Sequence, residues 1–172
     1  MSADKLIIRL LERQDIEFAR CLHNDESVLM KLSDASHVSE FQQEKWFNSV
    51  SASLNNLRYT ILEKATNEYV GVFRVDNIDM GNRSVCVGLD IAKSKRGQGY
   101  ARDAYNYFLD YFFAQRGFHR VYLATLETNA VASSLYMKLG FEVEGRSREA
   151  IFRDGKFQDL VWMSILASDY LK

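Results

Sequence analysis

The segment Ile91–Ala101, with the sequence Ile-Ala-Lys-Ser-Lys-Arg-Gly-Gln-Gly-Tyr-Ala, constrains the fold more than any other part of the chain. An apolar strand pattern ends there, two glycines follow, and a helical pattern then begins. Glycine adopts backbone dihedrals that side chains forbid, so several N–H groups of such a turn can point at one phosphate, and the helix dipole adds partial positive charge. An ordinary strand-to-helix connection has the same pattern, so this turn alone does not distinguish an anion-binding site from such a connection.

Length and composition indicate one domain of an ordinary globular class. The chain has 172 residues, of which 47% are hydrophobic and 26% charged, so it can bury a substantial core. Its 22 basic and 23 acidic residues give a net charge of −1, and we therefore expect no nucleic-acid partner. No apolar run is long enough for a membrane helix, and residues 1–5 lack the apolar core of a signal peptide, so we expect a cytoplasmic protein without membrane contact.

The cysteines and histidines show no spacing typical of chemistry. Cys21 and Cys86 match no metal or redox motif, and we expect both to be buried free thiols. His23, His37 and His119 lack the spacing of metal ligands, and no activated serine motif accompanies them. The sequence therefore predicts neither a metal site nor a histidine-based triad.

Hydrophobic periodicity predicts seven strands and four helices. The strands are expected at residues 6–11, 58–64, 69–75, 84–92, 121–126, 141–153 and 156–166. The helices are expected after Asp15 as N-cap, from Ser39 with a capping box to Gln42, from the glycine turn to Gly117, and at 129–139. Residues 24–38 show no clear pattern. Tyr105 and its aromatic neighbours in the third helix are expected in the core and at a partner surface.

Connections between these elements predict an α/β fold with one mixed sheet. A strand, helix and strand of these lengths form a crossover, which makes the fourth and fifth strands parallel. The pair Asp154-Gly155 is typical of a two-residue hairpin turn between the last two strands. The remaining pairings are therefore expected to be antiparallel.

Two motifs at matching spacing resemble the GNAT superfamily of N-acetyltransferases. The run Arg96-Gly97-Gln98-Gly99-Tyr100-Ala101 resembles its pyrophosphate loop, Arg/Gln-x-x-Gly-x-Gly/Ala. About thirty residues on, Asn129-x-x-Ala132-x-x-Leu135-Tyr136-x-Lys138-x-Gly140-Phe141 resembles its second signature. The resemblance covers essentially the whole chain, so residues 1–172 are expected to form a single N-acetyltransferase domain.

Two other phosphate-binding folds fit this context less well. A nucleotide-hydrolase loop ends in Gly-Lys-Ser/Thr, whereas this one ends in Gly99-Tyr100-Ala101. A dinucleotide fold has its glycine turn after the first strand of an alternating series, whereas this turn follows the fourth predicted strand.

The resemblance implies transfer of an acetyl group from acetyl-CoA to a primary amine, directly in a ternary complex. Such a site holds the acyl carbon near the nitrogen and supplies an acid and a proton acceptor. The implied coenzyme A contacts are the pyrophosphate loop, the edge of the fourth strand, and Asn129 as a secondary contact. By residue they are Leu89, Ile91, Ala92, Arg96, Gly97, Gln98, Gly99, Tyr100, Ala101 and Asn129.

Tyr136 is the residue that the resemblance implies as the acid that protonates the departing thiolate. A thiol titrates near ~8.5 and a tyrosine near ~10, so this transfer is only modestly uphill. Many relatives carry a glutamate base in the fourth strand where this chain has Cys86. Asp90, Glu127 or a chain of waters remain as alternatives for the base, beside the ordinary solvated or capping roles of both carboxylates.

The acceptor is left open by the motifs. The segments 144–148 and 154–159, with Met163, are similar to a subgroup that acetylates ribosomal-protein N-termini, spermidine or amino-sugar nucleotides, and Trp46-Phe47 is similar to the last branch. The acidic excess over residues 25–44 suits a cationic amine, and a solvated helix face explains it equally well.

Two further expectations concern activity and assembly. The absence of the strand glutamate makes a non-catalytic acyl-CoA-binding or sensor module the alternative to an enzyme. A C-terminal hairpin with an edge strand can support a homodimer.

Overall fold

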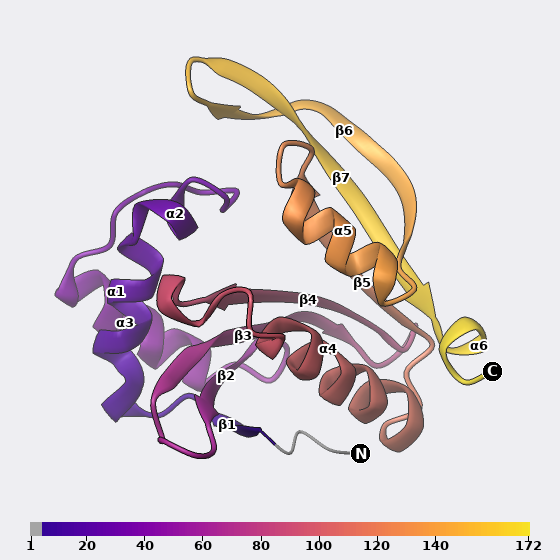
Figure 1. The fold of residues 1–172 in the computed structure, drawn as a ribbon, viewed down its shortest axis with the longest axis horizontal. Coiled ribbons are helices and arrows are strands. Elements are labelled where there is room, and N and C mark those ends of the chain that lie inside the picture. The colour runs from indigo at the N-terminus through magenta and orange to yellow at the C-terminus, as the bar shows by residue number, and fades with distance from the viewer. Residues whose placement is uncertain (1–4) are drawn as a thin grey trace.

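The computed structural model describes residues 5–172, which form one mixed sheet with helices on both faces (Figure 1). The strands are β1 (Leu6–Leu10), β2 (Leu57–Glu63), β3 (Tyr69–Asp79), β4 (Ser84–Ile91), β5 (Arg120–Leu126), β6 (Glu142–Arg153) and β7 (Lys156–Leu166). The α-helices are α1 (Ile16–Asn24), α2 (Glu26–Leu29), α3 (Glu40–Ser51), α4 (Tyr100–Asp110), α5 (Ala130–Lys138) and α6 (Ala167–Tyr170). Among these described residues, no helix is long and apolar enough to cross a membrane.

The sheet has the order β1-β2-β3-β4-β5-β7-β6. Strands β4 and β5 are parallel, because α4 crosses between them, and every other neighbouring pair is antiparallel. The predicted α/β class and its parallel pair are confirmed. Four of the six helices are long, as predicted, and α2 and α6 are single turns.

The main core lies between the sheet and α4. Ala104, Tyr105 and Phe108 recur at helical spacing on α4 and are almost completely buried. They pack on alternate residues of β3, and the Phe73 ring stacks on Phe108 with centroids 3.9 Å apart. Burial of each such large side chain contributes about 1.5–3 kcal/mol to folding, so this contact fixes α4, and the turn before it, on the sheet.

Helices α1 and α3 cover the opposite face at one end of the sheet, as Figure 1 shows in indigo and purple. Leu22 of α1 and Phe47 of α3 are buried against Val72 of β3 in a second, smaller core. Ser39 and Gln42 form the predicted capping box at the start of α3. These two helices therefore stand as a wall beside the central strands.

Asp15 precedes α1, as predicted, but its side chain does not cap the helix. Its carboxylate is fully buried and accepts hydrogen bonds from Arg9, from Thr60 Oγ1 at 2.9 Å and from Tyr69 Oη at 3.0 Å. Burial raises the pKa of Asp15, but the hydrogen bonds, that of Arg9 foremost, outweigh it and leave the pKa lowered. The carboxylate thus joins β1, β2 and β3 to the start of α1.

The cysteine prediction is wrong for Cys21, which lies exposed on α1. Its thiol is 3.2 Å from Oε1 of Glu17, one turn earlier on the same solvent-exposed side. Cys86 is partly buried, and neither cysteine forms a disulfide.

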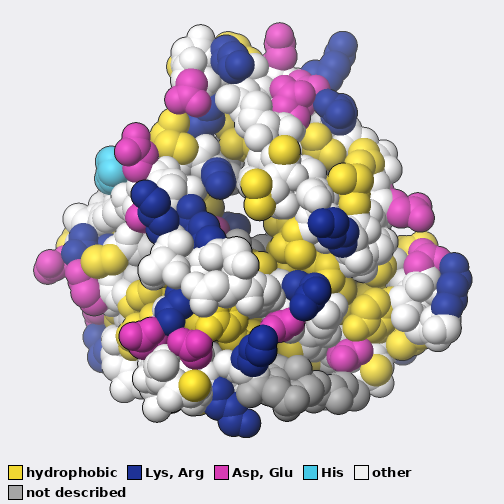
Figure 2. Space-filling view, in the orientation of Figure 1, with side chains coloured by type: hydrophobic (Ala, Val, Ile, Leu, Met, Phe, Trp, Pro, Cys, Tyr) yellow, Lys and Arg dark blue, Asp and Glu magenta, His cyan; other side chains and the backbone are white. Residues whose placement is uncertain are grey.

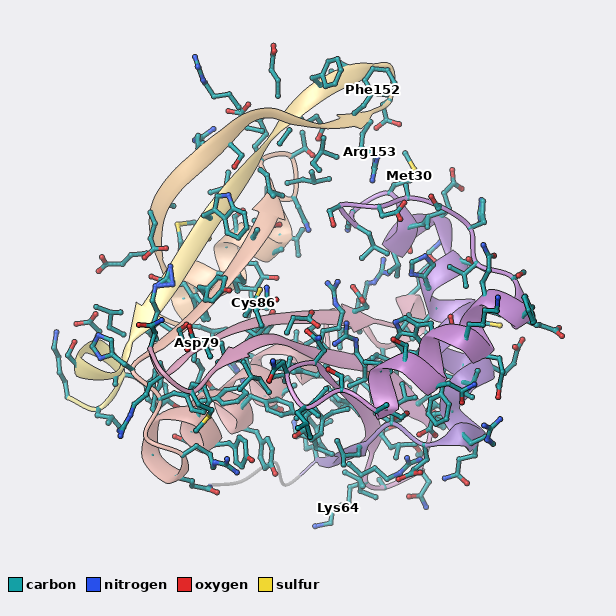
Figure 3. All side chains as sticks on the ribbon, turned by 180° about the vertical axis from the view of Figure 1, so that it is seen from behind. Met30, Lys64, Asp79, Cys86, Phe152 and Arg153 are labelled. Carbon is teal, nitrogen blue, oxygen red and sulfur yellow. The ribbon has the colours of Figure 1, made fainter. Side chains whose placement is uncertain are left out.

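Strands β6 and β7 form a long hairpin that arches over the molecule toward α2 (Figure 1). Asp154 and Gly155 both have positive φ, of 52° and 75°, which confirms the predicted two-residue turn. At its tip, Arg153 Nη2 donates to the carbonyls of Leu32 at 2.6 Å and Ser33 at 3.0 Å. Figure 3 shows Arg153 beside Met30, so the hairpin tip meets the segment that follows α2.

Candidate active site

The turn between β4 and α4 has the conformation that its glycines allow. Gly97 and Gly99 have φ of 76° and 86°, in the left-handed region. A Cβ at either position would have nothing within 4 Å, so glycine is required for its dihedral and not for space. Gly99 directly precedes α4, whose first N–H groups have no intrahelical partner. The turn therefore offers an anion several N–H groups and the positive end of a helix dipole.

Ion pairs fix this turn to the β2–β3 hairpin. Lys95 Nζ lies 2.8 Å from Oε2 of Glu63 and 2.5 Å from Oε2 of Glu68. The hydroxyl of Tyr100 donates to Oε1 of Glu63. The hydroxyl of Tyr100 therefore has its hydrogen-bond partner within the protein, and Tyr100 offers a ligand only its backbone N–H.

The remaining side chains of the turn fold back on its own backbone. Arg96 Nε donates to the carbonyl of Ile91 at 3.1 Å, and Gln98 Nε2 donates to that of Ser94 at 2.9 Å. Ala101 lies in the first turn of α4. These contacts hold the backbone in place without filling the space over the glycines.

Strands β4 and β5 pair only at their first three residues. The parallel pairing ends at Cys86 and Tyr122, and β4 continues to Ile91 without a neighbour on that side among the described strands. The N–H of Ala92 bonds to the carbonyl of Val70 in β3 at 2.9 Å. Because successive strand residues direct their backbone groups to opposite sides, Leu89 and Ile91 direct their N–H groups into the gap. The amide of Ala92 is already bonded within the protein.

Tyr136 of α5 packs against Tyr105 of α4 and against Phe141. The helix begins after Asn129, whose Oδ1 accepts from the N–H of Ala132 as N-cap. Tyr136 is 8% exposed, and its hydroxyl accepts a hydrogen bond from Tyr105 at 3.4 Å. Burial raises the pKa of Tyr136, while the hydrogen bond from Tyr105 acts in the opposite direction. The hydroxyl thus stays protonated at neutral pH with its own proton free for another acceptor.

Alternate residues of β4 place Cys86, Gly88 and Asp90 on one face of the sheet. Burial, the largest cause, raises the pKa of Cys86 to about 11, so its thiol is protonated and cannot serve as a base at neutral pH. Asp90 is 20% exposed, and its Oδ2 lies 3.5 Å from Nε of Arg74 on β3. The charge of Arg74 lowers the pKa of Tyr136 and that of Asp90 raises it, both less than burial does.

Glu127 lies at the base of the β6–β7 hairpin. Its Oε1 accepts from the N–H of Asp159 at 3.2 Å, and its Oε2 lies 3.3 Å from Nη1 of Arg146. Both carboxylate oxygens therefore bind the hairpin, and Asp90 is the better placed of the two candidate bases.

A cavity of about 400 Å³ lies between the α1–α3 wall and the face of β2, β3 and β4 that carries Asp90. Its lining includes Asp34, Trp46, Arg58, Arg74 and Asp90. Figure 2 shows a central hollow on this side of the molecule, with Lys and Arg side chains around it. The cavity reaches Asp90 from the side opposite α4, so a second reactant has its own entrance.

The sequence patterns do not reveal the roles of two residues of the site. Tyr105 has the spacing of a core residue, and only the packing of α4 against α5 brings its hydroxyl to Tyr136. Arg74 is a charged residue within an apolar strand, which is a signal for a buried polar role, but its partner is set by strand register.

Comparison with known proteins identifies the family of this site. Residues 5–142 match the acetyltransferase (GNAT) domain family. Spermidine N(1)-acetyltransferase from Vibrio cholerae is 32% identical over 167 residues, which cover 97% of this chain and 96% of that protein. The [ribosomal protein uS5]-alanine N-acetyltransferase of Escherichia coli is 22% identical and covers 99% of this chain and 92% of its own.

Solved structures agree with the sequence comparison. The crystal structure of spermidine N-acetyltransferase from Vibrio cholerae, in complex with CoA and spermine, has a TM-score of 0.92 with this chain. The two are 30% identical, and the match covers 98% of this chain and 99% of that one.

Proposed function

This chain belongs to the GNAT acetyltransferase family and is an acetyl-CoA-dependent N-acetyltransferase, and we propose that its residues 1–172 form one domain that acetylates a small primary amine bound in the cavity beside Asp90. The observation that carries this proposal is the glycine turn and the unpaired edge of β4 next to the cavity that Asp90 lines. The small-molecule acceptor is supported by the size of the cavity, about 400 Å³, and by the polyamine named with the Vibrio cholerae relative.

The glycine turn and the open edge of β4 fit coenzyme A. The N–H groups of Gly97 to Ala101 suit a pyrophosphate, and those of Leu89 and Ile91 suit the amides of a pantetheine arm. Acetyl-CoA supplies the acyl group as a thioester. The N–H groups at the end of β4 are also donors for the negative charge that develops on the carbonyl oxygen.

Proton transfers on both reactants are assigned to Asp90 and Tyr136. The amine loses one proton when its nitrogen bonds to the acyl carbon, and Asp90 receives it, directly or through a water. The sulfur gains one proton when the carbon–sulfur bond breaks, and the Tyr136 hydroxyl provides it. Tyr105, which donates to Tyr136 Oη, stabilises the tyrosinate that remains. Exchange with solvent then restores both groups, so the net products are an amide and a thiol.

A thiol-release assay with acetyl-CoA and a panel of amines tests this function. The panel contains polyamines, peptides with free N-termini and amino sugars with and without phosphate, and mass spectrometry identifies the acetylated product. Tyr136→Phe is expected to lose turnover by ~10²–10⁴-fold while it binds acetyl-CoA as the unmodified protein does. Tight acetyl-CoA binding without thiol release for any amine would instead support the non-catalytic acyl-CoA-binding module.

A further inference from the structure

Arg74 lies in the acceptor cavity with an unused hydrogen-bond donor. Its side chain is 36% exposed, but its Nε is buried and has no hydrogen-bond partner among residues 5–172. The nearest anion, Asp90, lies 3.5 Å away without hydrogen-bond geometry. A buried donor without an acceptor is destabilising, so such a group in a cavity indicates a ligand that supplies the acceptor.

The backbone next to Arg74 is shaped to hold its guanidinium. Gly88 is the β4 residue directly opposite Arg74 in the strand pairing. A Cβ at Gly88 would stand 2.8 Å from Nη2 and 3.0 Å from Cζ of Arg74. The guanidinium therefore lies flat against β4 only because residue 88 has no side chain.

Charges along the cavity floor do not suit a polycation. Arg58 of β2 lies opposite Arg74 in the pairing and is already bonded to Asp76 at 2.7 Å. Asp90 is the partner of Arg74, so the two arginines and their two carboxylates sum to zero. Asp34 at the rim is exposed, and its Oδ1 already accepts from Ser36. Asp90 is the only carboxylate that the strands contribute to the described lining of the cavity, and it already faces Arg74.

We propose that the acceptor carries a phosphate or carboxylate close to its primary amine, and that Arg74 binds this anion. The inference rests on the proposed function, because it concerns the acceptor of the same transfer. An anion on the amine substrate replaces Asp90 as the ion-pair partner of Arg74. It also accepts the hydrogen bond that Nε of Arg74 can donate. Asp90 is thereby released to take the proton of the amine. The planar guanidinium favours a bidentate oxyanion, which phosphate esters and carboxylates both present.

Matched acceptor pairs test this inference through thiol release. Ethanolamine is compared with phosphoethanolamine, glucosamine with glucosamine 6-phosphate, and 3-aminopropanol with β-alanine, and spermidine is the polycationic reference. We expect kcat/KM to be at least ~10-fold higher for an anionic member than for its neutral partner. A preference confined to the first two pairs assigns phosphate as the anion, and one confined to the third assigns carboxylate.

Variants of Arg74 and Gly88 separate anion binding from other roles. Arg74→Met and Gly88→Ala, whose Cβ displaces the guanidinium, are expected to bring the anionic-to-neutral ratio close to one, mainly through KM. Arg74→Lys keeps the charge and is expected to retain part of the ratio. Arg13→Met, at a largely exposed arginine outside the cavity lining, is the matched control and is expected to leave the ratio unchanged.

Three results would overturn the inference. The first is equal or better turnover of the neutral member in every pair, or of spermidine than of every anionic member, and the second is an Arg74→Met variant that slows all acceptors equally. The third is calorimetry in which CoA-saturated protein binds phosphoethanolamine, glucosamine 6-phosphate and β-alanine no more tightly than their neutral partners. If no amine releases thiol, the proposed function fails, and the calorimetry still decides whether Arg74 binds an anion.

Discussion

The hydrogen bond between Tyr105 and Tyr136 can be tested by removing each hydroxyl alone and then both together. Tyr136→Phe removes the proposed acid, and a loss of ~10²–10⁴-fold in kcat is expected. Tyr105→Phe removes a donor that acts only through Tyr136, by stabilising its tyrosinate over a contact that is long at 3.4 Å. Such a bond is worth ~0.5–1.5 kcal/mol, so kcat is expected to fall by roughly 2- to 12-fold.

The double variant gives the sharper result. Because Tyr105 has nothing to stabilise once the Tyr136 hydroxyl is gone, the double variant is expected to be no slower than Tyr136→Phe alone. Single-turnover thiol release at saturating acetyl-CoA measures the step, and the acetyl-CoA dissociation constant is expected to stay the same throughout. Losses that multiply in the double variant would refute the arrangement, because they would show that Tyr105 acts independently of Tyr136.

The unfolding free energies of the same variants test this pair of tyrosines independently. Tyr136→Phe leaves the completely buried Tyr105 hydroxyl without its partner, which costs about 1–3 kcal/mol of unfolding free energy. The double variant removes both hydroxyls and is expected to regain much of this loss. Urea unfolding of the four proteins measures the difference.

Three further predictions follow from the site and the fold. Asp90→Asn is expected to lower kcat by at least ~10²-fold at pH 7, and by less toward pH 10, where hydroxide can accept the proton of the attacking amine instead; a loss that is constant across the pH–rate profile would argue against Asp90 as the base. Gly99→Ala forces a side chain into φ of 86° at a strain of ~1–2 kcal/mol, so calorimetry is expected to show acetyl-CoA bound roughly 5- to 30-fold more weakly, with acceptor KM unchanged. Asp15→Asn is expected to destabilise the fold by about 3–5 kcal/mol at pH 7. The pKa of Asp15 is lowered in the folded protein. Its carboxylate therefore stabilises the fold at pH values above the unfolded-state pKa of ~3.9, and this stabilisation is lost as pH falls through the folded-state pKa. The unfolding free energies of Asp15→Asn and of the unmodified protein should therefore converge in acid.

The conformation of the glycine turn and the starts of α4 and α5 were predictable because their determinants are local in the chain. The dihedrals of Gly97 and Gly99, the start of α4 and the cap at Asn129 depend on residues a few positions apart. A short pattern can therefore specify them, and a resemblance to a family can identify them. The same holds for the capping box of α3 and for the hairpin turn at Asp154-Gly155.

The acceptor side was not predictable, because its residues meet only through tertiary structure. Arg74 finds Gly88 through strand register, and Tyr105 finds Tyr136 through the packing of two helices. Asp15 illustrates the same limit, since an aspartate before a helix ordinarily caps it. Here, hydrogen bonds from Arg9 and Thr60 on neighbouring strands compete successfully for that carboxylate.

The position of β7 between β5 and β6 determines the order in which the molecule can assemble during synthesis. Strand β5 gains its antiparallel neighbour only after residues 156–166 have left the ribosome, although everything that forms the glycine turn has emerged earlier. The contact between the hairpin tip and the segment after α2 also forms at this late stage, because Arg153 and Leu32 lie 121 positions apart in the chain. Contacts of such large sequence separation form slowly, so a nascent chain can complete its glycine turn well before the hairpin tip meets the segment after α2.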